Sequence, residues 1–168
     1  MGELFDLAGK VAVITGSSRG IGKAIAQRMA EHGAKVVISS RKAGPCDEVA
    51  AEINAKHPGE AIAIPASISS KEDLQRLVDE TVKAFGKIDI VVCNAATNPF
   101  FGPMAKIEDD SFLKILDNNI IANNWLIQMA APKGSSRLVQ RIGRANHRLD
   151  EPSRAVLVPA SRFEMLEC

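Results

Sequence analysis

The chain has 168 residues, 46% hydrophobic and 24% charged, with a formal net charge of +1, which is typical of one globular domain with a buried core. This near-neutral charge argues against partners bound by bulk electrostatics, so we expect no nucleic acid and no membrane surface. Without a membrane-length apolar stretch or a signal-peptide pattern, and with three scattered cysteines that suggest neither disulfides nor a metal site, the expected location is the cytoplasm.

Four apolar, mostly β-branched runs recur along the first 95 residues. VAVITG begins at Val11, KVVISS at Lys35, AIAIPA at Ala61 and IDIVVCNA at Ile88. Consecutive apolar positions are typical of strands covered on both faces, as in a parallel sheet. Strand starts about 25 residues apart leave room for one crossover helix each. The pattern predicts an α/β fold with a doubly wound parallel sheet.

The clearest helix lies between the third and fourth runs. Apolar residues from Leu74 to Phe85 recur at the spacing of one helix face. Ser70 is the expected cap at its start, and Gly86 is the expected left-handed residue at its end.

The chain changes character after a loop at 97–104 and a helix expected at about 111–131. Residues 1–132 contain 4 Arg and 10 Lys, whereas residues 133–168 contain 6 Arg and 1 Lys without clear periodicity. We therefore divide the chain into an N-terminal domain, 1–132, and an atypical Arg-rich tail. Translation out of frame in a G+C-rich gene produces such a shift, and a disordered tail is the alternative.

The segment TGSSRGIG, residues 15–22, connects the first strand to the first helix. Such a turn presents free backbone N–H groups and the positive end of the helix dipole, which together favour an anion. We expect Gly16 to permit the tight turn, Gly20 to let a pyrophosphate approach the backbone, and Gly22 to let the helix pack closely on the sheet.

Three motifs, in order along the chain, resemble those of the classical short-chain dehydrogenases/reductases. TGSSRGIG resembles the family's T-G-x-x-x-G-[IL]-G, CNAAT at 93–97 resembles N-N-A-G, and LDNNI at 116–120 resembles the D-x-N stretch. NAATNPFFG resembles in particular the NADP-dependent carbonyl/retinol reductase branch. The resemblance covers residues 7 to about 132. It implies a Rossmann-type fold, incomplete after the fourth strand and following helix, and an oxidoreductase that transfers hydride between a nicotinamide cofactor and a carbonyl/alcohol pair.

The end of the second strand decides between the two nicotinamide cofactors. An acidic residue there would bind the ribose 2′-OH of NAD(H), but the sequence has Ser39, Ser40 and Arg41, with Arg19 in the glycine loop. Arginine binds phosphate oxygens in a bidentate fork, so NADP(H) is expected and NAD(H) is the alternative. Where the family usually has an Asp near the adenine, this chain has Ser67, whose hydroxyl could still contact that ring.

The resemblance implies a set of site residues. The cofactor-binding positions are Gly16, Ser18, Arg19, Gly20, Ile21, Gly22, Ser40, Arg41, Ser67, Ile68, Asn94 and Ala95. The one catalytic position with a counterpart is Asn119, with Asn118 as the alternative one register away. The family's Tyr, which acts as acid/base, and the Lys four residues on have no counterpart, because the chain contains no tyrosine.

The remaining catalytic candidates lie in the tail. Nominal candidates for the family's Ser are Ser135, Ser136 and Ser161. His147 with Asp150 suggests a base with an orienting carboxylate, but this spacing on an Arg-rich segment is more typical of a solvated face.

Two functions remain open. The chain is either the cofactor-binding half of an NADP(H)-dependent oxidoreductase for a small carbonyl or alcohol, catalytically incomplete as it stands, or a non-catalytic nucleotide-binding or interaction protein that retains the Rossmann half. In the family, the helix with Asn119 packs across a dimer interface with the helix that carries Tyr and Lys. We therefore expect a compromised homo-oligomer interface, an exposed sheet edge and poor cover over apolar residues. These are Ile115, Ile120, Ile121, Trp125, Leu126 and Met129.

Overall fold

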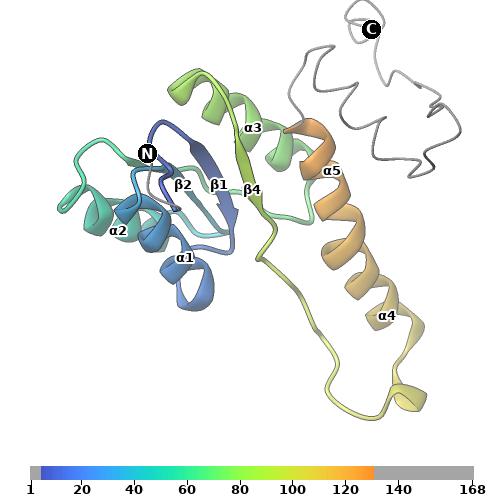
Figure 1. Ribbon diagram of the computed structural model, residues 1–168. Helices are drawn as coiled ribbons and strands as arrows, with labels where there is room; N and C mark the ends of the chain where they lie inside the picture. Colours follow the sequence, from blue (N-terminus) through green and yellow to red (C-terminus); the bar gives the residue numbers. More distant parts are fainter. Residues whose placement is uncertain (1–4, 131–168) are drawn as a thin grey trace, which may run out of the picture. The chain divides into compact units, whose positions relative to one another are not determined.

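Four parallel strands form one sheet in the computed structural model, which describes residues 5–130 (Figure 1). Their bounds are β1 Val11–Thr15, β2 Lys35–Ser39, β3 Ala61–Ala63 and β4 Ile90–Val92. The strand order is β3-β2-β1-β4, so β1 and β2 lie in the middle and β3 and β4 at the edges. All neighbours are parallel, which confirms the fold class that the apolar runs predicted.

Helices cover both faces of this sheet. Their bounds are α1 Gly20–Glu31, α2 Ala43–Asn54, α3 Lys71–Phe85, α4 Asp109–Leu116 and α5 Ala122–Met129. In Figure 1, α1 and α2 lie on one side of the sheet and α3 and α5 on the other. This is the doubly wound arrangement, and it places the start of each helix that follows a strand at the carboxyl edge of the sheet.

The core consists of two apolar clusters, one on each face of the sheet. Ile14 and Ile38 pack with α1 and α2, whereas Val13 and Val37 pack with α3 and α5. All four side chains are 0% exposed. Since successive side chains of a strand point to opposite faces, a strand covered on both faces must be apolar at consecutive positions.

The predicted ends of α3 are confirmed. The Ser70 hydroxyl accepts the backbone N–H of Asp73 at 3.1 Å, and Gly86 follows the helix with a φ of +79°. Leu74 and Leu77, on the predicted apolar face, are fully buried. Local signals therefore suffice to place this helix.

The helix expected at about 111–131 is divided in the structure. It starts at Asp109, and a π-helical turn, Asp117–Ile121, separates α4 from α5. A π-helical turn inserts one extra residue into the helix. The side chains of Asn118 and Asn119 in this turn bond to loops outside the helix, a tertiary effect that sequence periodicity does not reveal.

The apolar residues expected to lack cover in the segment from α4 to α5 are exposed at two positions. Ile120 and Ile121 are 59% and 40% exposed. Leu126, by contrast, is 1% exposed because it packs in the core cluster with α3, so the expectation is wrong at that position. The other three positions are half-buried, namely Ile115, Trp125 and Met129. β4 is an edge strand of the described sheet, as expected.

Part of the sequence interpretation falls outside the described residues. This applies to the boundary at 132, to the Arg-rich tail at 133–168 and to the catalytic candidates in it. These are Ser135, Ser136, Ser161, His147 and Asp150. Among residues 5–130, no helix is long and apolar enough to cross a membrane.

Candidate functional site

A cavity of about 730 Å³ lies at the carboxyl ends of the strands. Its walls come from the ends of β1 and β2, the starts of α1 and α2, and the loops that follow β3 and β4. The structure brings together most of the predicted cofactor-binding residues there. The lining includes Gly16, Ser18, Arg19, Gly20, Ile21, Gly22, Ser40, Arg41, Ile68, Asn94 and Ala95.

The three glycines of the segment TGSSRGIG, at the end of β1 and the start of α1, meet conformational and packing requirements that a side chain would violate. Gly16 and Gly20 have φ values of +67° and +58°, which side-chain-bearing residues rarely adopt. A Cβ on Gly22 would collide with the carbonyl oxygen of Gly16 and lie 2.6 Å from Nδ2 of Asn94. In the described part of the chain, no atom lies within 4 Å of a Cβ built on Gly20. Because Gly20 lines the cavity, that side of it offers room for a ligand to reach the backbone.

Thr15 and Asn94 join the glycine loop to the loop after β4. The Thr15 hydroxyl accepts the N–H groups of Asn94 and Ala95, both at 3.1 Å, and donates to the Val92 carbonyl at 3.3 Å. The Asn94 amide donates to the carbonyls of Thr15 at 2.9 Å and of Gly16 at 3.2 Å. Thr15 was not predicted as a site residue, although it is the first residue of the glycine motif.

Ser17 ties the same loop to β2. Its buried hydroxyl donates to the carbonyl of Ile14 at 2.7 Å and accepts the N–H of Ser39 at 2.9 Å. The glycine loop is thus fixed to both neighbouring strand ends, which holds its backbone N–H groups in place without a ligand.

Three cationic side chains line the cavity. Arg19, Arg41 and Lys42 all line it and are exposed, and none of them takes part in an ion pair within residues 5–130. Next to them, the Ser40 hydroxyl lies 3.1 Å from the Cys46 thiol. No acidic side chain belongs to the lining in the described part of the chain. Lys42 was not predicted, although it directly follows the Ser-Arg pair.

Two of these cations stand at helix N-termini. Arg19 is the N-cap of α1 and Lys42 that of α2, and within the described range neither helix has a side-chain cap or an acidic residue in its first turn. The first N–H groups of an uncapped helix favour an anion. The cavity therefore combines two such N-termini with three cations, an environment suited to more than one phosphate group.

The predicted catalytic position, Asn119, contacts the cavity wall through Thr97. Its Oδ1 accepts the N–H of Thr97 at 2.8 Å and its Nδ2 donates to the Thr97 carbonyl at 3.0 Å, and Thr97 lines the cavity. The amide of Asn123 donates to the backbone carbonyl of Asn119 at 2.8 Å. The alternative position, Asn118, is buried and bonds instead to Ser69. Asn119 is therefore a second anchor of the loop after β4, at Thr97, in addition to the bonds that Thr15 makes to Asn94 and Ala95.

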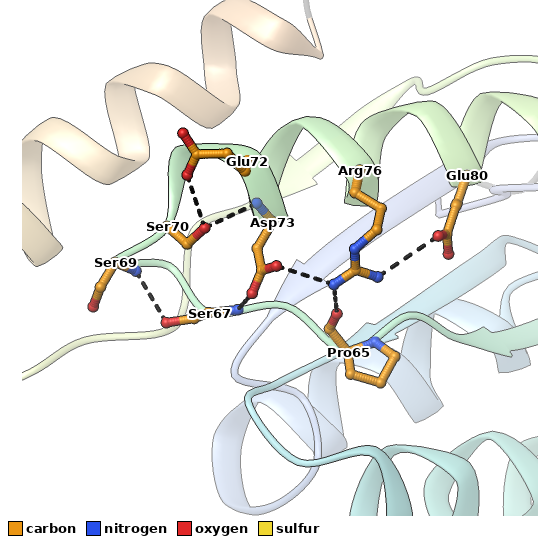
Figure 2. Close-up of polar contacts among 8 residues, drawn as sticks. All are labelled: Pro65, Ser67, Ser69, Ser70, Glu72, Asp73, Arg76 and Glu80. Atoms are coloured by element: carbon orange, nitrogen blue, oxygen red, sulfur yellow. Dashed lines mark hydrogen bonds and ion pairs between the residues drawn. The ribbon is translucent and has the colours of Figure 1, made fainter.

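Ser67 is the one predicted cofactor residue that does not line the cavity. Its hydroxyl accepts the N–H of Ser69 at 3.3 Å, and its own N–H donates to the Asp73 carboxylate at 2.9 Å (Figure 2). This N–H, together with the guanidinium of Arg76, holds the pKa of Asp73 below its ordinary value. The neighbours Ile68 and Ser69 form the cavity wall instead.

Cys93 stands where the resemblance places the first Asn of the N-N-A-G motif. Burial raises the pKa of its thiol, so the neutral form dominates at neutral pH. Its side chain packs against the core cluster on the α3 face of the sheet. Cys93 is therefore a packing residue rather than a nucleophile.

This fold and cavity define a Rossmann-type domain, with its candidate site where such domains bind ligands. The sequence model of the family described as short chain dehydrogenase matches residues 10–142, and the chain belongs to this family. Tropinone reductase-like 3 from Erythroxylum coca is 43% identical over 139 residues, which are 81% of this chain and 53% of that protein. Human dehydrogenase/reductase SDR family member 4 is 40% identical over 134 residues, 78% of this chain and 47% of that protein.

The solved structures agree with the sequence comparison. A metagenomic short-chain oxidoreductase in complex with NADP superposes with a TM-score of 0.68 at 33% identity, covering 75% of this chain and 57% of that one. The chain spans about half the length of the curated relatives it matches.

Proposed function

We propose that this chain binds NADP(H) in the cavity and forms the cofactor-binding half of a short-chain oxidoreductase that acts on carbonyl or alcohol compounds. One observation carries the proposal. A single cavity combines a glycine loop at a helix N-terminus with three cations, and no acidic residue of the described chain lines it. The NADP complex of the related metagenomic oxidoreductase supports the choice of cofactor.

Each part of the cavity has a distinct role in this proposal. The N–H groups around Gly20 at the start of α1 hold the pyrophosphate, because a helix N-terminus stabilises an anion. Arg19, Ser40 and Arg41 hold the ribose 2′-phosphate through charge-assisted hydrogen bonds. Asn94 and its neighbours keep the loop after β4 against the other end of the dinucleotide. When bound, the cofactor supplies or accepts a hydride.

We further propose that the 168-residue chain binds the cofactor without family-like turnover. Reduction of a carbonyl develops an alkoxide, and a proton must be supplied to it at neutral pH. In the family a Tyr–Lys pair does this, and this sequence contains no tyrosine. The remaining catalytic position, Asn119, orders the loop at Thr97, but its amide supplies no proton to the alkoxide. This observation favours the second candidate function, a nucleotide-binding protein without catalysis.

Calorimetric titration of the purified chain with NADPH and with NADH tests the cofactor proposal. We expect NADPH to bind at least about tenfold more tightly, because charge-assisted bonds to the 2′-phosphate are worth about 1.5–3 kcal/mol. Equal affinity for the two cofactors would refute the 2′-phosphate assignment, and no binding of either would refute the cavity as the cofactor site. NADPH oxidation with a panel of carbonyl compounds then tests catalysis, and turnover at rates typical of dehydrogenases would contradict the non-catalytic proposal.

A further inference from the structure

Two neighbouring asparagines in the π-helical turn between α4 and α5 hold two separate walls of the cavity. Asn119 holds Thr97 in the loop after β4, and Asn118 holds Ser69 in the loop after β3. These two loops leave the opposite edge strands of the described sheet, and both line the cavity. One turn of helix therefore fixes parts of the site that are distant along the chain.

The loop after β3 is clamped from one side by α3. Arg76 donates to the Pro65 carbonyl at 2.7 Å, and the Asp73 carboxylate accepts the N–H of Ser67 at 2.9 Å (Figure 2). Ala66, between these anchors, and Ile68, directly after them, line the cavity, whereas Pro65 and Ser67 do not. The clamp fixes the loop as far as Ser67.

Beyond Ser67, the backbone N–H groups of Ser69 and Ser70 bond to the hydroxyl and the carbonyl of Ser67 at 3.3 and 3.1 Å, and Asn118 adds an anchor for the Ser69 side chain. Ser69 is exposed and lines the cavity, and its hydroxyl donates to Oδ1 of Asn118 at 2.8 Å. Asn118 is only 4% exposed and does not itself line the cavity. A buried polar side chain is kept only where its hydrogen bond offsets the cost of its desolvation. The bond to Ser69 supplies this offset.

We propose that Asn118 is a positioning residue of the cofactor site, which fixes Ser69 and, through it, the cavity wall formed by Ile68 and Ser69. This inference rests on the proposed function, since it assigns that wall to the adenine end of the bound dinucleotide. Asn118 acts without touching the ligand. Together with Asn119, it makes the π-helical turn a common anchor for both walls.

Adenosine 2′,5′-bisphosphate is the probe for this proposal, because it carries the adenine and the 2′-phosphate but no nicotinamide. Its affinity is measured by calorimetry for the wild-type chain, Asn118→Leu, Ser69→Ala and the double variant. We expect Asn118→Leu to weaken binding by about threefold to tenfold, the usual effect of one hydrogen bond. The double variant should bind no more weakly than Asn118→Leu alone, because both changes remove the same bond.

Two further variants separate positioning from a general structural effect. Ser69→Thr retains the hydroxyl that donates to Asn118 and should bind within about twofold of the wild type, since the hydrogen bond is kept. Asn124→Leu is the matched control, because Asn124 is an exposed residue of α5 that bonds only to Gln128 among the described side chains. It should bind as the wild type does.

Wild-type affinity in Asn118→Leu, or full additivity of its effect with that of Ser69→Ala, would overturn the inference. Circular dichroism reports whether Asn118→Leu folds. If it does not fold, Ser69→Ala is compared with Ser69→Thr, which keeps the hydroxyl, and equal affinities of these two would overturn it as well. Failure of the wild-type chain to bind the bisphosphate would instead refute the proposed function and, with it, this inference.

Discussion

The starts of α1 and α2 differ from the start of α3, although all three helices follow a strand at the same edge of the sheet. In α3, Ser70 caps the first turn, and Glu72 and Asp73 place negative charge there. In α1 and α2 the N-caps are Arg19 and Lys42, and within residues 5–130 neither first turn has a side-chain cap or an acid. Every helix leaves its first N–H groups without partners inside the helix. In α3 the Ser70 side chain accepts one of them, that of Asp73, whereas in the part of the chain that the structure describes no side-chain cap accepts any of them at the starts of α1 and α2, which line the cavity.

The difference distinguishes a structural helix start from one suited to a ligand. The carboxylate of Asp73 accepts the N–H of Ser67 and bonds to the guanidinium of Arg76 (Figure 2). These bonds hold the loop whose next residues, Ile68 and Ser69, line the cavity. The cations at α1 and α2 have no described carboxylate partner and line the cavity instead. Opposite charges at equivalent positions thus separate the two helix starts that we propose bind the cofactor phosphates from the capped start of α3.

The largest effect is expected from Gly22→Ala at the start of α1. Its Cβ would meet the Gly16 carbonyl and the Asn94 amide, so we expect the free energy of unfolding to fall by about 1–3 kcal/mol and NADPH binding to be lost. Urea unfolding followed by circular dichroism measures the stability. Gly44→Ala in the first turn of α2 is the matched control, because a Cβ there meets no described atom. It should leave stability unchanged or raise it by up to about 1 kcal/mol. Equal stability of the two variants would contradict this reading of the glycine loop.

Arg41→Ala removes one cation from the α2 side of the cavity. NADPH affinity should fall by about tenfold to a hundredfold while NADH affinity stays within about twofold, because only the 2′-phosphate loses a charge-assisted bond. Calorimetry measures both. Arg28→Ala is the control, since Arg28 lies on α1 outside the cavity lining and pairs with Glu31. A similar loss for both cofactors would show that Arg41 does not discriminate between them.

Lys42→Asp turns the start of α2 into one that resembles α3. An Asp at the N-cap should raise the free energy of unfolding by about 0.5–1 kcal/mol, because it accepts a first-turn N–H and complements the helix dipole. The same carboxylate should weaken NADPH binding by about tenfold through repulsion of the phosphate. Unfolding and titration measure the two effects. If the free energy of unfolding and the NADPH affinity both rise or both fall, the proposal that the start of α2 is suited to a ligand rather than to helix stability is contradicted.

The smallest effect concerns the pH dependence of Asp73 at α3. The N–H of Ser67 and the guanidinium of Arg76 lower the pKa of this carboxyl in the folded state. Its stabilising contribution is therefore present at neutral pH and is lost as the pH falls below about 4, through the folded-state pKa. The contribution should be at most about 1 kcal/mol, because solvent screens the partly exposed carboxylate. The unfolding free energies of the wild type and Asp73→Asn should converge at low pH, and a constant difference between them would contradict this assignment.

The sequence predicted those features that depend on neighbouring residues. The apolar runs predicted the strands because both faces of the sheet are covered, and Ser70 and Gly86 marked the ends of α3 because caps act within one turn. The glycine loop, Ser40 and Arg41 likewise lie together in the cavity. All of these signals are local.

Features that depend on contacts between distant segments were not predictable. The role of Thr15 depends on N–H groups about 80 residues away, which only the strand order brings close. The π-helical turn contains Asn118 and Asn119, whose side chains bond to two loops distant along the chain. Ser67 was placed at the cavity, but Asp73 turns its backbone toward α3, so Ile68 and Ser69 line the wall instead. Which of the successive residues in a loop line the cavity cannot be predicted from the sequence alone.

Amide hydrogen exchange of the 168-residue chain, with and without saturating NADPH, tests the contrast between the helix starts most directly. Binding at the cavity should slow exchange at the backbone N–H groups of Gly20, Ile21 and Ala43, at the starts of α1 and α2. The capped start of α3, at Glu72 and Asp73, should change little. Protection of α3 equal to that of α1 and α2, or no protection at the glycine loop, would contradict the assignment of the two uncapped helix starts to the cofactor phosphates.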